Sequence, residues 1–272
     1  MSATGQVVGF VGAGKMGEPM VGRLVGAGFS VQVYARRPEV RERLAAAGAV
    51  PVDSVAAVAG EADIVISCLF SDAQLLEVAT GPDGLMANAK AGTVVVSHTT
   101  GTVSTLVNLM AEFPDGPVLV DAPVSGGAHD IAAGKLTVLL GGPDDAVARA
   151  QPVLAAYADP VITTGGLGTA LNLKLINNVL FASNAQLVAG AVELAKNLGV
   201  PETSLFAALE HCSGGSRAAT YVQSAGGVQN FGKVVAPFMR KDVAACIEAA
   251  ADRGVELGQL RTVAETGPLD LS

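Results

Sequence analysis

Short apolar runs alternate with amphipathic stretches through the first half of the chain. Each run has the length of a strand, and the stretch after it repeats apolar positions at the spacing of a helix. Strands are expected at 7–11, 30–34, 62–69, 93–97, 118–121, 136–141 and 161–163, and helices at 16–26, 38–47, 72–80, 103–112 and 143–157. This alternation predicts an α/β domain with a doubly wound parallel sheet and right-handed crossovers.

The pattern changes after residue 164. A glycine-containing loop follows at 165–168, and no further strand is expected beyond it. Helical spacing without proline runs from 169 to 199, which corresponds to a helix of roughly 45 Å. Further helices are expected at 202–211, 218–224 and 241–258.

The sequence therefore predicts an α/β domain at 1–164 and an all-helical domain at 165–272 that begins with the long helix. The long helix is apolar around much of its circumference, so it needs neighbours on several sides. Pairing with another subunit would provide them.

Composition and charge narrow the class of partner. Of the 272 residues, 50% are apolar and 15% are charged, and the formal net charge is −8. The net charge argues against nucleic acid or an anionic membrane as a main partner. The low charge content suggests apolar surface buried between subunits, in a homodimer or homotetramer. The N-terminus has no basic segment followed by a long apolar one, and the three cysteines form no C-x-x-C pair, so we expect a cytoplasmic protein with free thiols.

A glycine-rich turn follows the first expected strand. Gly12, Gly14 and Gly17 form a G-x-G-x-x-G pattern between the apolar run and a helical stretch. A strand that turns sharply into a helix directs backbone N–H groups and the positive end of the helix dipole at one point, where a pyrophosphate can bind. Gly12 permits the turn, Gly14 lets the phosphate approach, and Gly17 lets the helix pack on the strand.

The context of this turn predicts a Rossmann-type dinucleotide-binding domain. The alternative is a glycine-rich turn that binds nothing. Under the dinucleotide hypothesis, the residues between the glycines also lie at the cofactor, namely Ala13, Lys15 and Met16.

The end of the second expected strand bears on the choice of cofactor. NAD-binding domains carry an acidic residue there, which accepts hydrogen bonds from the ribose 2′-hydroxyl. Here the strand is followed by Arg36, Arg37 and Pro38, with no Asp or Glu before the proline. Guanidinium groups bind a 2′-phosphate and a carboxylate repels one, so the sequence favours NADP over NAD without excluding NAD. The alternative is a solvated basic turn that opens a helix at Pro38.

A second glycine pair follows the expected strand that ends at Asp121, in the segment Ala-Pro-Val-Ser-Gly-Gly. In an open α/β sheet, ligands bind beyond the carboxyl ends of the strands. The Ser125 hydroxyl and the N–H groups of Gly126 and Gly127 can together hold a carboxylate. The alternative is an ordinary β-turn.

Two polar residues lie near the start of the long helix. Lys174 and Asn178 are four residues apart and therefore share one face, among apolar neighbours. A lysine in such a place is costly unless it has a partner or a function. The alternatives are a lysine that extends to solvent and an exposed asparagine. Further along, the charged segment Arg240-Lys241-Asp242 is expected to open the last helix.

Four segments in this order resemble the β-hydroxyacid dehydrogenase family, which includes 3-hydroxyisobutyrate dehydrogenase and tartronate semialdehyde reductase. They are the glycine-rich turn with Met20, the segment 121–127 continuing to 137, the stretch 166–178, and Lys241-Asp242. The resemblance spans nearly the whole chain, and the Ser-Gly-Gly plus Lys-x-x-x-Asn combination is specific to this superfamily. It implies an enzyme that transfers a hydride between a nicotinamide and a small β-hydroxy acid or its semialdehyde.

The resemblance implies a role for each matched position. Lys174 corresponds to the family's catalytic lysine, the general acid–base. Ser125, Gly126 and Gly127 correspond to the anchor of the substrate carboxylate, and Asn178 to the residue that orients the substrate. The implied cofactor contacts are Arg36 at the 2′-phosphate, Leu69 and Phe70 against the cofactor, Thr100 beside the nicotinamide ribose, and Lys241.

Some positions depart from the family pattern. The family usually has Pro where this chain has Phe70, Gly at Ala170, and small residues with a second Gly-Ala at 128–131. Because these positions lie near the expected pocket, they predict an unfamiliar substrate. The three histidines fit no metal-binding spacing. His129 either tunes specificity or is a loop residue without a role.

Two other hypotheses remain open. Imine reductases resemble the same scaffold, although they usually lack the lysine found here at position 174. A protein that binds NADP without turnover would keep the glycine-rich turn and would not need Lys174 together with Asn178.

Overall fold

The structure is a computed structural model that describes residues 5–271. Contacts between Cα atoms divide the chain into two compact units, Met1–Lys174 and Leu175–Ser272. The division falls inside the long helix α9 (Thr169–Asn197), so the start of this helix belongs with the first unit.

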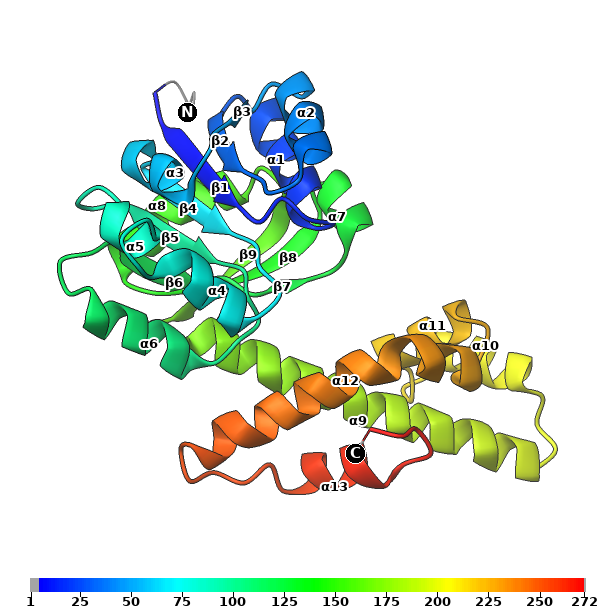
Figure 1. Cartoon of the computed structure of the whole chain (residues 1–272). Coiled ribbons are helices and arrows are strands. Elements are labelled where there is room, and N and C mark those ends of the chain that lie inside the picture. The colour runs from blue at the N-terminus through cyan, green and yellow to red at the C-terminus, as the bar shows by residue number, and fades with distance from the viewer. Residues whose placement is uncertain (1–4, 272) are drawn as a thin grey trace. The chain divides into compact units, whose positions relative to one another are not determined.

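The first unit is built on one nine-stranded sheet (Figure 1). Its strands follow the order β3-β2-β1-β4-β5-β6-β8-β7, and β9 also pairs with β8. The strands are β1 Val7–Val11, β2 Ser30–Tyr34, β3 Val50–Pro51, β4 Ile64–Ser67, β5 Val94–Ser97, β6 Val118–Asp121, β7 Val124–Ser125, β8 Leu136–Gly141 and β9 Ala158–Gly165. The first six are parallel, so their carboxyl ends meet along one edge. The strand order reverses between β1 and β4, and open α/β sheets bind ligands at such a point.

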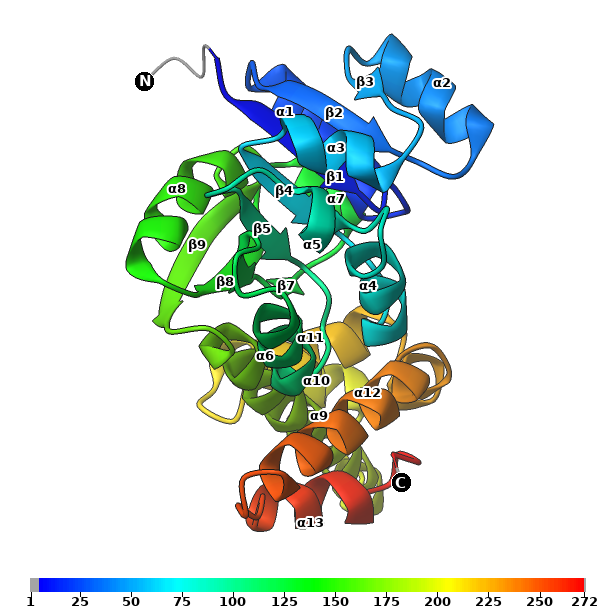
Figure 2. The ribbon, with the colours of Figure 1, turned by 60° about the vertical axis from the view of Figure 1, so that its left-hand side comes forward.

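Helices cover both faces of this sheet, which Figure 2 shows from a second direction. Successive side chains of a strand point to opposite faces, and in β4 Ile64 and Ile66 pack in one buried cluster while Val65 packs in the other. The first cluster includes residues of α1, α2, α7 and α8, and the second includes residues of α3, α4, α5 and α6. These helices are α1 Gly17–Gly26, α2 Pro38–Ala46, α3 Val55–Glu61, α4 Asp72–Ala79, α5 Leu85–Asn88, α6 Val103–Glu112, α7 Ala128–Ala132 and α8 Asp144–Leu154.

Helix starts differ in how their first N–H groups are satisfied. Ser54, Ser71 and Thr102 each accept a hydrogen bond from the backbone N–H three residues later, at the starts of α3, α4 and α6. Helix α1 starts after Met16 without a side-chain cap. The N-terminal end of α1 is therefore suited to an anion from outside the chain.

The expectation of an all-parallel sheet is wrong at one end. Strand β8 runs antiparallel to β6 and to β7, and parallel to β9. Part of the connection after β6 forms β7, which pairs with β8. Apolar periodicity identifies a strand but carries no information on its direction.

The second unit is all-helical. After the remainder of α9 it contains α10 Glu202–His211, α11 Arg217–Ser224, α12 Val228–Ala251 and α13 Gln259–Thr266. Its buried core joins α9, through Val179 and Ala182, to Phe206 of α10 and Phe231 of α12. The expectation that no strand follows the loop at 165–168 is confirmed as far as residue 271.

The expected start of the last long helix at Lys241 is wrong. Helix α12 begins at Val228, and Arg240, Lys241 and Asp242 lie in its interior. Pro237 lies inside the helix as well. A proline usually marks a helix boundary, so the sequence pattern placed the start too late.

Helix α9 has the length and apolar composition to cross a membrane, and in the described part of the chain no other helix does. Within its most apolar 18-residue window, 44% of the residues are buried inside the protein. Its buried positions belong to the helical core described above.

Short elements escaped the sequence analysis. These are β3, α3, α5, β7, α7 and α13. None is longer than eight residues, and apolar periodicity needs a longer window to give a signal.

Candidate active site

A cavity of about 910 Å³ lies at the carboxyl ends of β1, β2 and β4 in the first unit. Its volume is typical of a pocket for a cofactor or small ligand. Most of the predicted cofactor residues line it, namely Gly12, Ala13, Gly14, Lys15, Met16, Gly17, Arg36, Arg37, Leu69 and Phe70. Thr100 follows β5 in the same unit, and Lys241 lies on α12 in the second unit. The cofactor contacts themselves stay predictions.

The three glycines of the first turn are each required for a different reason. Gly12 has a φ of +96°, and a Cβ there would collide with the carbonyl oxygen of Cys68. A Cβ on Gly17 would collide with the carbonyl oxygen of Gly12 and lie 2.8 Å from a ring carbon of Phe10. A Cβ on Gly14 would meet nothing within 4 Å. The protein itself thus requires Gly12 and Gly17, whereas the open space at Gly14 suits a bound phosphate.

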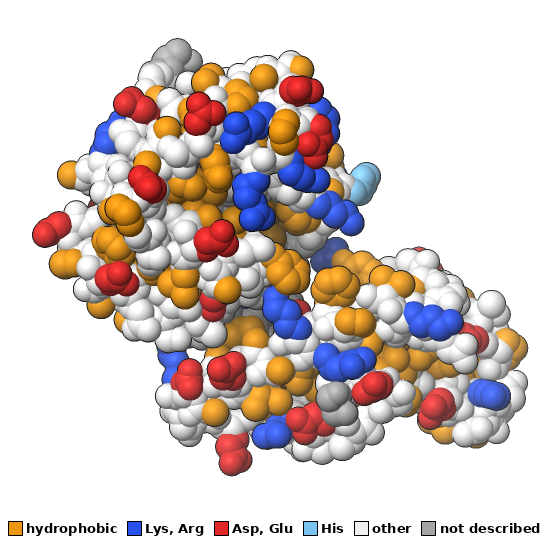
Figure 3. All heavy atoms as spheres, in the orientation of Figure 1, with side chains coloured by type: hydrophobic (Ala, Val, Ile, Leu, Met, Phe, Trp, Pro, Cys, Tyr) orange, Lys and Arg blue, Asp and Glu red, His pale blue; other side chains and the backbone are white. Residues whose placement is uncertain are grey.

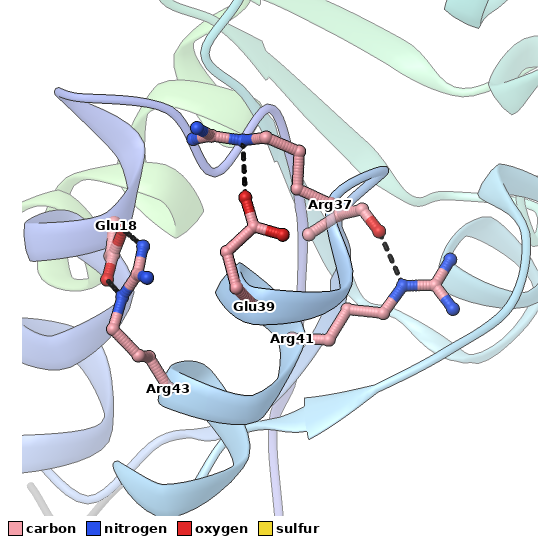
Figure 4. Close-up of polar contacts among 6 residues, drawn as sticks. Glu18, Arg37, Glu39, Arg41 and Arg43 are labelled. Atoms are coloured by element: carbon pink, nitrogen blue, oxygen red, sulfur yellow. Dashed lines mark hydrogen bonds and ion pairs between the residues drawn. The ribbon is translucent and has the colours of Figure 1, made fainter.

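The two arginines that line the cavity differ in their partners. Arg37 Nε lies 3.8 Å from the Glu39 carboxylate. Arg36 is exposed, and its side chain makes no ion pair or hydrogen bond with any residue between 5 and 271. Arg41 donates from Nε to the Ala35 carbonyl oxygen at 2.5 Å and so holds the turn that carries both arginines (Figure 4). Arg36 is therefore available for a bound anion.

An ion pair joins α1 to α2 beside this turn. Arg43 donates to both carboxylate oxygens of Glu18, at 2.6 and 2.8 Å (Figure 4). The hydrogen bond from Arg43 lowers the pKa of Glu18, and the charge of Arg37 lowers it further. Basic and acidic side chains intermingle over this region of the first unit (Figure 3). The pair neutralises a carboxylate that lies one residue after Gly17.

The predicted substrate anchor lies between β7 and α7. Ser125 is exposed, and Gly126 has a φ of +126°, which favours glycine. The N–H of Gly127 donates to the Asp130 carboxylate at 2.7 Å, as part of the start of α7. Asp130, in the segment that departs from the family pattern, therefore uses one of the donors assigned to a substrate carboxylate. The anchoring role of the three residues stays a prediction.

Lys174 lies on α9 and is the last residue of the first unit. It therefore belongs to the same unit as Ser125. Hydrogen bonds attach the start of its helix to the sheet. Asp121 at the end of β6 accepts them from Gly168 N and Leu171 N, each at 2.8 Å. In the sequence, Asp121 is visible only as part of a motif, and nothing near it indicates this contact with residues 47 and 50 positions away.

Asn178 lies in the second unit and is held by α12. Its Nδ2 donates to the Asp242 carboxylate at 2.9 Å, and its Oδ1 accepts from Asn177 Nδ2 at 3.1 Å. Two of the family segments noted in the sequence are thus neighbours inside one unit. The role of Asp242 was missed because its sequence signal was that of a charged helix start.

A buried polar pair lies at the end of β5. His98 is 4% exposed, its Nδ1 lies 2.5 Å from the Ala122 carbonyl oxygen, and its Nε2 lies 2.7 Å from the Tyr157 hydroxyl. A carbonyl oxygen can only accept, so Nδ1 carries the proton and Nε2 accepts from the hydroxyl. Burial lowers the pKa of His98 to about 4, so the ring is neutral at pH 7. This histidine supports the fold beneath the site.

Comparison with known proteins covers both units. The NAD-binding domain family of 6-phosphogluconate dehydrogenase matches residues 7–166, and the NAD-binding family of NADP-dependent 3-hydroxyisobutyrate dehydrogenase matches residues 168–267. The chain is 34% identical to L-threonate dehydrogenase of Cupriavidus necator over 77% of this chain and 71% of that protein. This chain belongs to the β-hydroxyacid dehydrogenase family. The resemblance inferred from the sequence motifs is therefore confirmed.

Other members of this family agree with that assignment. Mitochondrial 3-hydroxyisobutyrate dehydrogenase of Mus musculus is 36% identical over 71% of this chain, which spans 57% of the mouse protein. The structure of Mycobacterium tuberculosis 3-hydroxyisobutyrate dehydrogenase with L-serine is 28% identical, with a TM-score of 0.84 over 98% of this chain and 96% of that one. This β-hydroxyacid dehydrogenase is thus an NAD(P)-dependent oxidoreductase that acts on CH–OH groups.

The fold is shared more widely. Imine reductase from Pseudomonas sp. has 23% sequence identity and a TM-score of 0.56 over 91% of this chain and 77% of that one. At this level of identity the likeness shows the fold alone.

Proposed function

We propose that this β-hydroxyacid dehydrogenase uses NADP(H) and interconverts a small β-hydroxy acid with its semialdehyde or ketone. The observation that carries the proposal is the cavity that brings Arg36 together with the turn from Gly12 to Gly17. The names of its relatives point to short hydroxy acids as substrates, namely 3-hydroxyisobutyrate and L-threonate.

Two features of the cavity support NADP. Arg36 is exposed at its wall and available for a 2′-phosphate, and the nearby carboxylate of Glu18 is neutralised by Arg43. Leu69 and Phe70 would lie against the cofactor, Thr100 beside its ribose, and Lys241 would also contact it.

The protein's own residues would hold the substrate and move one proton, while the bound nicotinamide supplies or accepts the hydride. Lys174 would accept the hydroxyl proton during oxidation, directly or through a water. During reduction it would donate a proton to the carbonyl oxygen, where its charge also stabilises the developing alkoxide. Ser125 and Gly126 would hold the substrate carboxylate, and the N–H of Gly127 would join them by exchanging the Asp130 carboxylate for that of the substrate. Asn178 would orient the substrate.

A substrate panel tests the proposal. It contains 3-hydroxyisobutyrate, L-threonate, glyoxylate, succinic semialdehyde and a cyclic imine, each with NADP(H) and with NAD(H), followed by absorbance of the reduced nicotinamide. We expect turnover of a hydroxy acid or aldehyde acid, with a higher kcat/KM for NADP(H). Turnover of the imine alone would instead favour an imine reductase, a hypothesis against which Lys174 weighs.

Replacement of the lysine tests the mechanism. Lys174→Ala should lower kcat by roughly a hundredfold to ten-thousandfold, because the proton then has no positioned donor or acceptor. The dissociation constant for NADPH, measured by its fluorescence, should change less than about twofold, since the residues of the cavity are untouched. Full activity of this variant would show that another group moves the proton.

We also propose that the protein is a homodimer or homotetramer in the cytoplasm that assembles through the helical unit. Ile176, Leu180, Leu187 and Leu194 of α9 are between 47% and 60% exposed and follow one another at helical spacing. Exposed apolar side chains that recur along one long helix are typical of a subunit interface. Light scattering should give a multiple of the 27.2 kDa chain mass, and a monomer would contradict the proposal.

A further inference from the structure

Asp121 is a carboxylate with no exposed surface at the end of β6. Oδ1 accepts from the N–H of Gly168 and Oδ2 accepts from the N–H of Leu171, each at 2.8 Å. A carboxylate is costly to bury unless hydrogen bonds satisfy it. Here the donors are backbone groups at the start of α9, so the side chain caps that helix from the neighbouring sheet.

The residue that would normally cap α9 has no side chain to do so. Gly168 immediately precedes the helix and has a φ of +88°, and a Cβ there would collide with the side chain of Val103. Ser, Thr or Asp, the usual N-cap residues, do not fit at this position. Asp121 supplies the missing cap, and Gly141 of β8 makes room for it, since a Cβ on Gly141 would lie 2.7 Å from Asp121 Oδ1.

The Asp121 carboxylate lies close in sequence to the predicted substrate anchor, and it contacts the start of the helix that carries the predicted catalytic lysine. Ser125 follows Asp121 by four residues, and Lys174 follows Leu171 by less than one helical turn. All of these residues belong to the first unit. The side chain of Asp121 and its two hydrogen bonds therefore connect the segment that contains Ser125 to the start of the helix that carries Lys174.

We propose that Asp121 is a positioning residue that fixes the Lys174 ammonium relative to the substrate anchor at Ser125, by holding the first turn of α9. The negative charge at the start of this helix is also favoured by the helix dipole. The inference rests on the proposed function, because it requires Lys174 to move the proton. A cap that served stability alone would lower the free energy of unfolding when removed, and would leave the kcat of the folded protein unchanged whether or not Lys174 is present.

A double-mutant cycle on kcat separates these two roles. It compares the unmodified protein with Asp121→Asn, Lys174→Ala and the double variant, using NADP⁺ and 3-hydroxyisobutyrate, or the hydroxy acid of the panel that is turned over fastest. Asp121→Asn keeps the shape of the side chain but presents an amide N–H to one of the two backbone donors. Alone it should lower kcat by about tenfold to a hundredfold, because a displacement of about 1 Å is enough for such a loss.

In the Lys174→Ala background, Asp121→Asn should change the remaining rate less than about twofold, since there is no longer an ammonium to position. Methylamine added to both lysine-free proteins supplies an ammonium that is not attached to α9, and any rate it restores should be equal in the two. The dissociation constant for NADPH should stay within about twofold throughout.

Asp63→Asn is the matched control, because Asp63 Oδ2 also accepts a backbone N–H, that of Val7 at 2.9 Å, at the other end of the sheet. It should lower the melting temperature without lowering kcat below that temperature. If Asp121→Asn does not fold, Thr169→Val takes its place, since Thr169 Oγ1 donates to Gly166 O at 2.7 Å and orders the same loop.

The outcomes distinguish the inference from the proposed function. Loss of activity in Lys174→Ala together with an unchanged kcat in Asp121→Asn would overturn the positioning role alone. An equal loss caused by Asp121→Asn with and without Lys174 would also overturn it. Full activity of Lys174→Ala would overturn the proposed function, and the positioning role with it.

Discussion

At the scale of single residues, Gly12 and Gly14 lie two positions apart in the same turn but serve different purposes. Gly12 has a φ of +96°, and any side chain there would collide with the Cys68 carbonyl, whereas Gly14 has nothing within 4 Å of an added Cβ. The G-x-G-x-x-G pattern showed that both are glycines, and the surrounding atoms show why each one is needed.

This difference predicts opposite effects of the same substitution. Gly12→Ala should destabilise the protein strongly, through backbone strain and a collision in the turn. Gly14→Ala should leave the melting temperature nearly unchanged and raise the dissociation constant for NADPH by about tenfold or more, because the methyl group takes space needed by a phosphate. Thermal unfolding and NADPH fluorescence on both variants check this, and unchanged NADPH binding in Gly14→Ala would place the phosphates elsewhere.

At the scale of elements, helices α1 and α2 are joined by the ion pair of Glu18 with Arg43. The positive charge of Arg37, which lines the cavity, also lowers the pKa of Glu18. Under the proposed use of NADP, Arg43 would keep Glu18 from competing for the arginines that face the 2′-phosphate. The proposal therefore gives the contact between the two helices a part in cofactor choice as well as in packing.

Removal of Arg43 should weaken NADP⁺ binding more than NAD⁺ binding. In Arg43→Met the unpaired Glu18 would draw Arg37 away, and we expect the dissociation constant for NADP⁺ to rise about threefold to tenfold, with a smaller change for NAD⁺. Arg261→Met, which breaks the Arg261–Glu265 pair within α13, is the control for loss of one positive charge. Equal changes for both cofactors, or an equal effect of the control, would contradict this account.

At the scale of the whole molecule, His98 makes the stability of the folded chain depend on pH. Its hydrogen bonds join the end of β5 to Ala122 and to Tyr157, and burial lowers its pKa from 6.5 to about 4. Between these values the unfolded chain binds a proton at this histidine and the folded chain does not. Stability from this group is therefore present above about pH 6.5 and is lost as the pH falls toward 4.

The free energy of unfolding should thus fall with acidification. From pH 7 to pH 5 the contribution of His98 is about 2 kcal/mol. His98→Asn keeps a polar side chain that does not titrate, so its urea-unfolding curves should show a fall smaller by about that amount. A pH dependence identical to that of the unmodified protein would show that other groups cause the acid sensitivity.

Much of the architecture could be predicted from the sequence, because the spacing of apolar residues distinguishes strands from helices. The strands at Val7–Val11 and Ser30–Tyr34 and the helix at Val103–Glu112 were predicted with their observed bounds. Strand direction at β8 and the start of α12 could not be predicted in the same way. The first depends on pairing partners, and the second was hidden by Pro237, which the tertiary packing tolerates inside a helix.

By itself, the sequence determined the family, the α/β and helical parts, and the motifs of the predicted site. Each of these depends on patterns among residues that are close together along the chain. Only the tertiary structure decided what those residues contact. Asp121 meets the start of α9 across 47 and 50 positions, His98 meets Tyr157 across 59, and Asn178 meets Asp242 across 64. No local pattern encodes a hydrogen bond at such separations, because its donor and acceptor become neighbours only when the sheet and the helices pack.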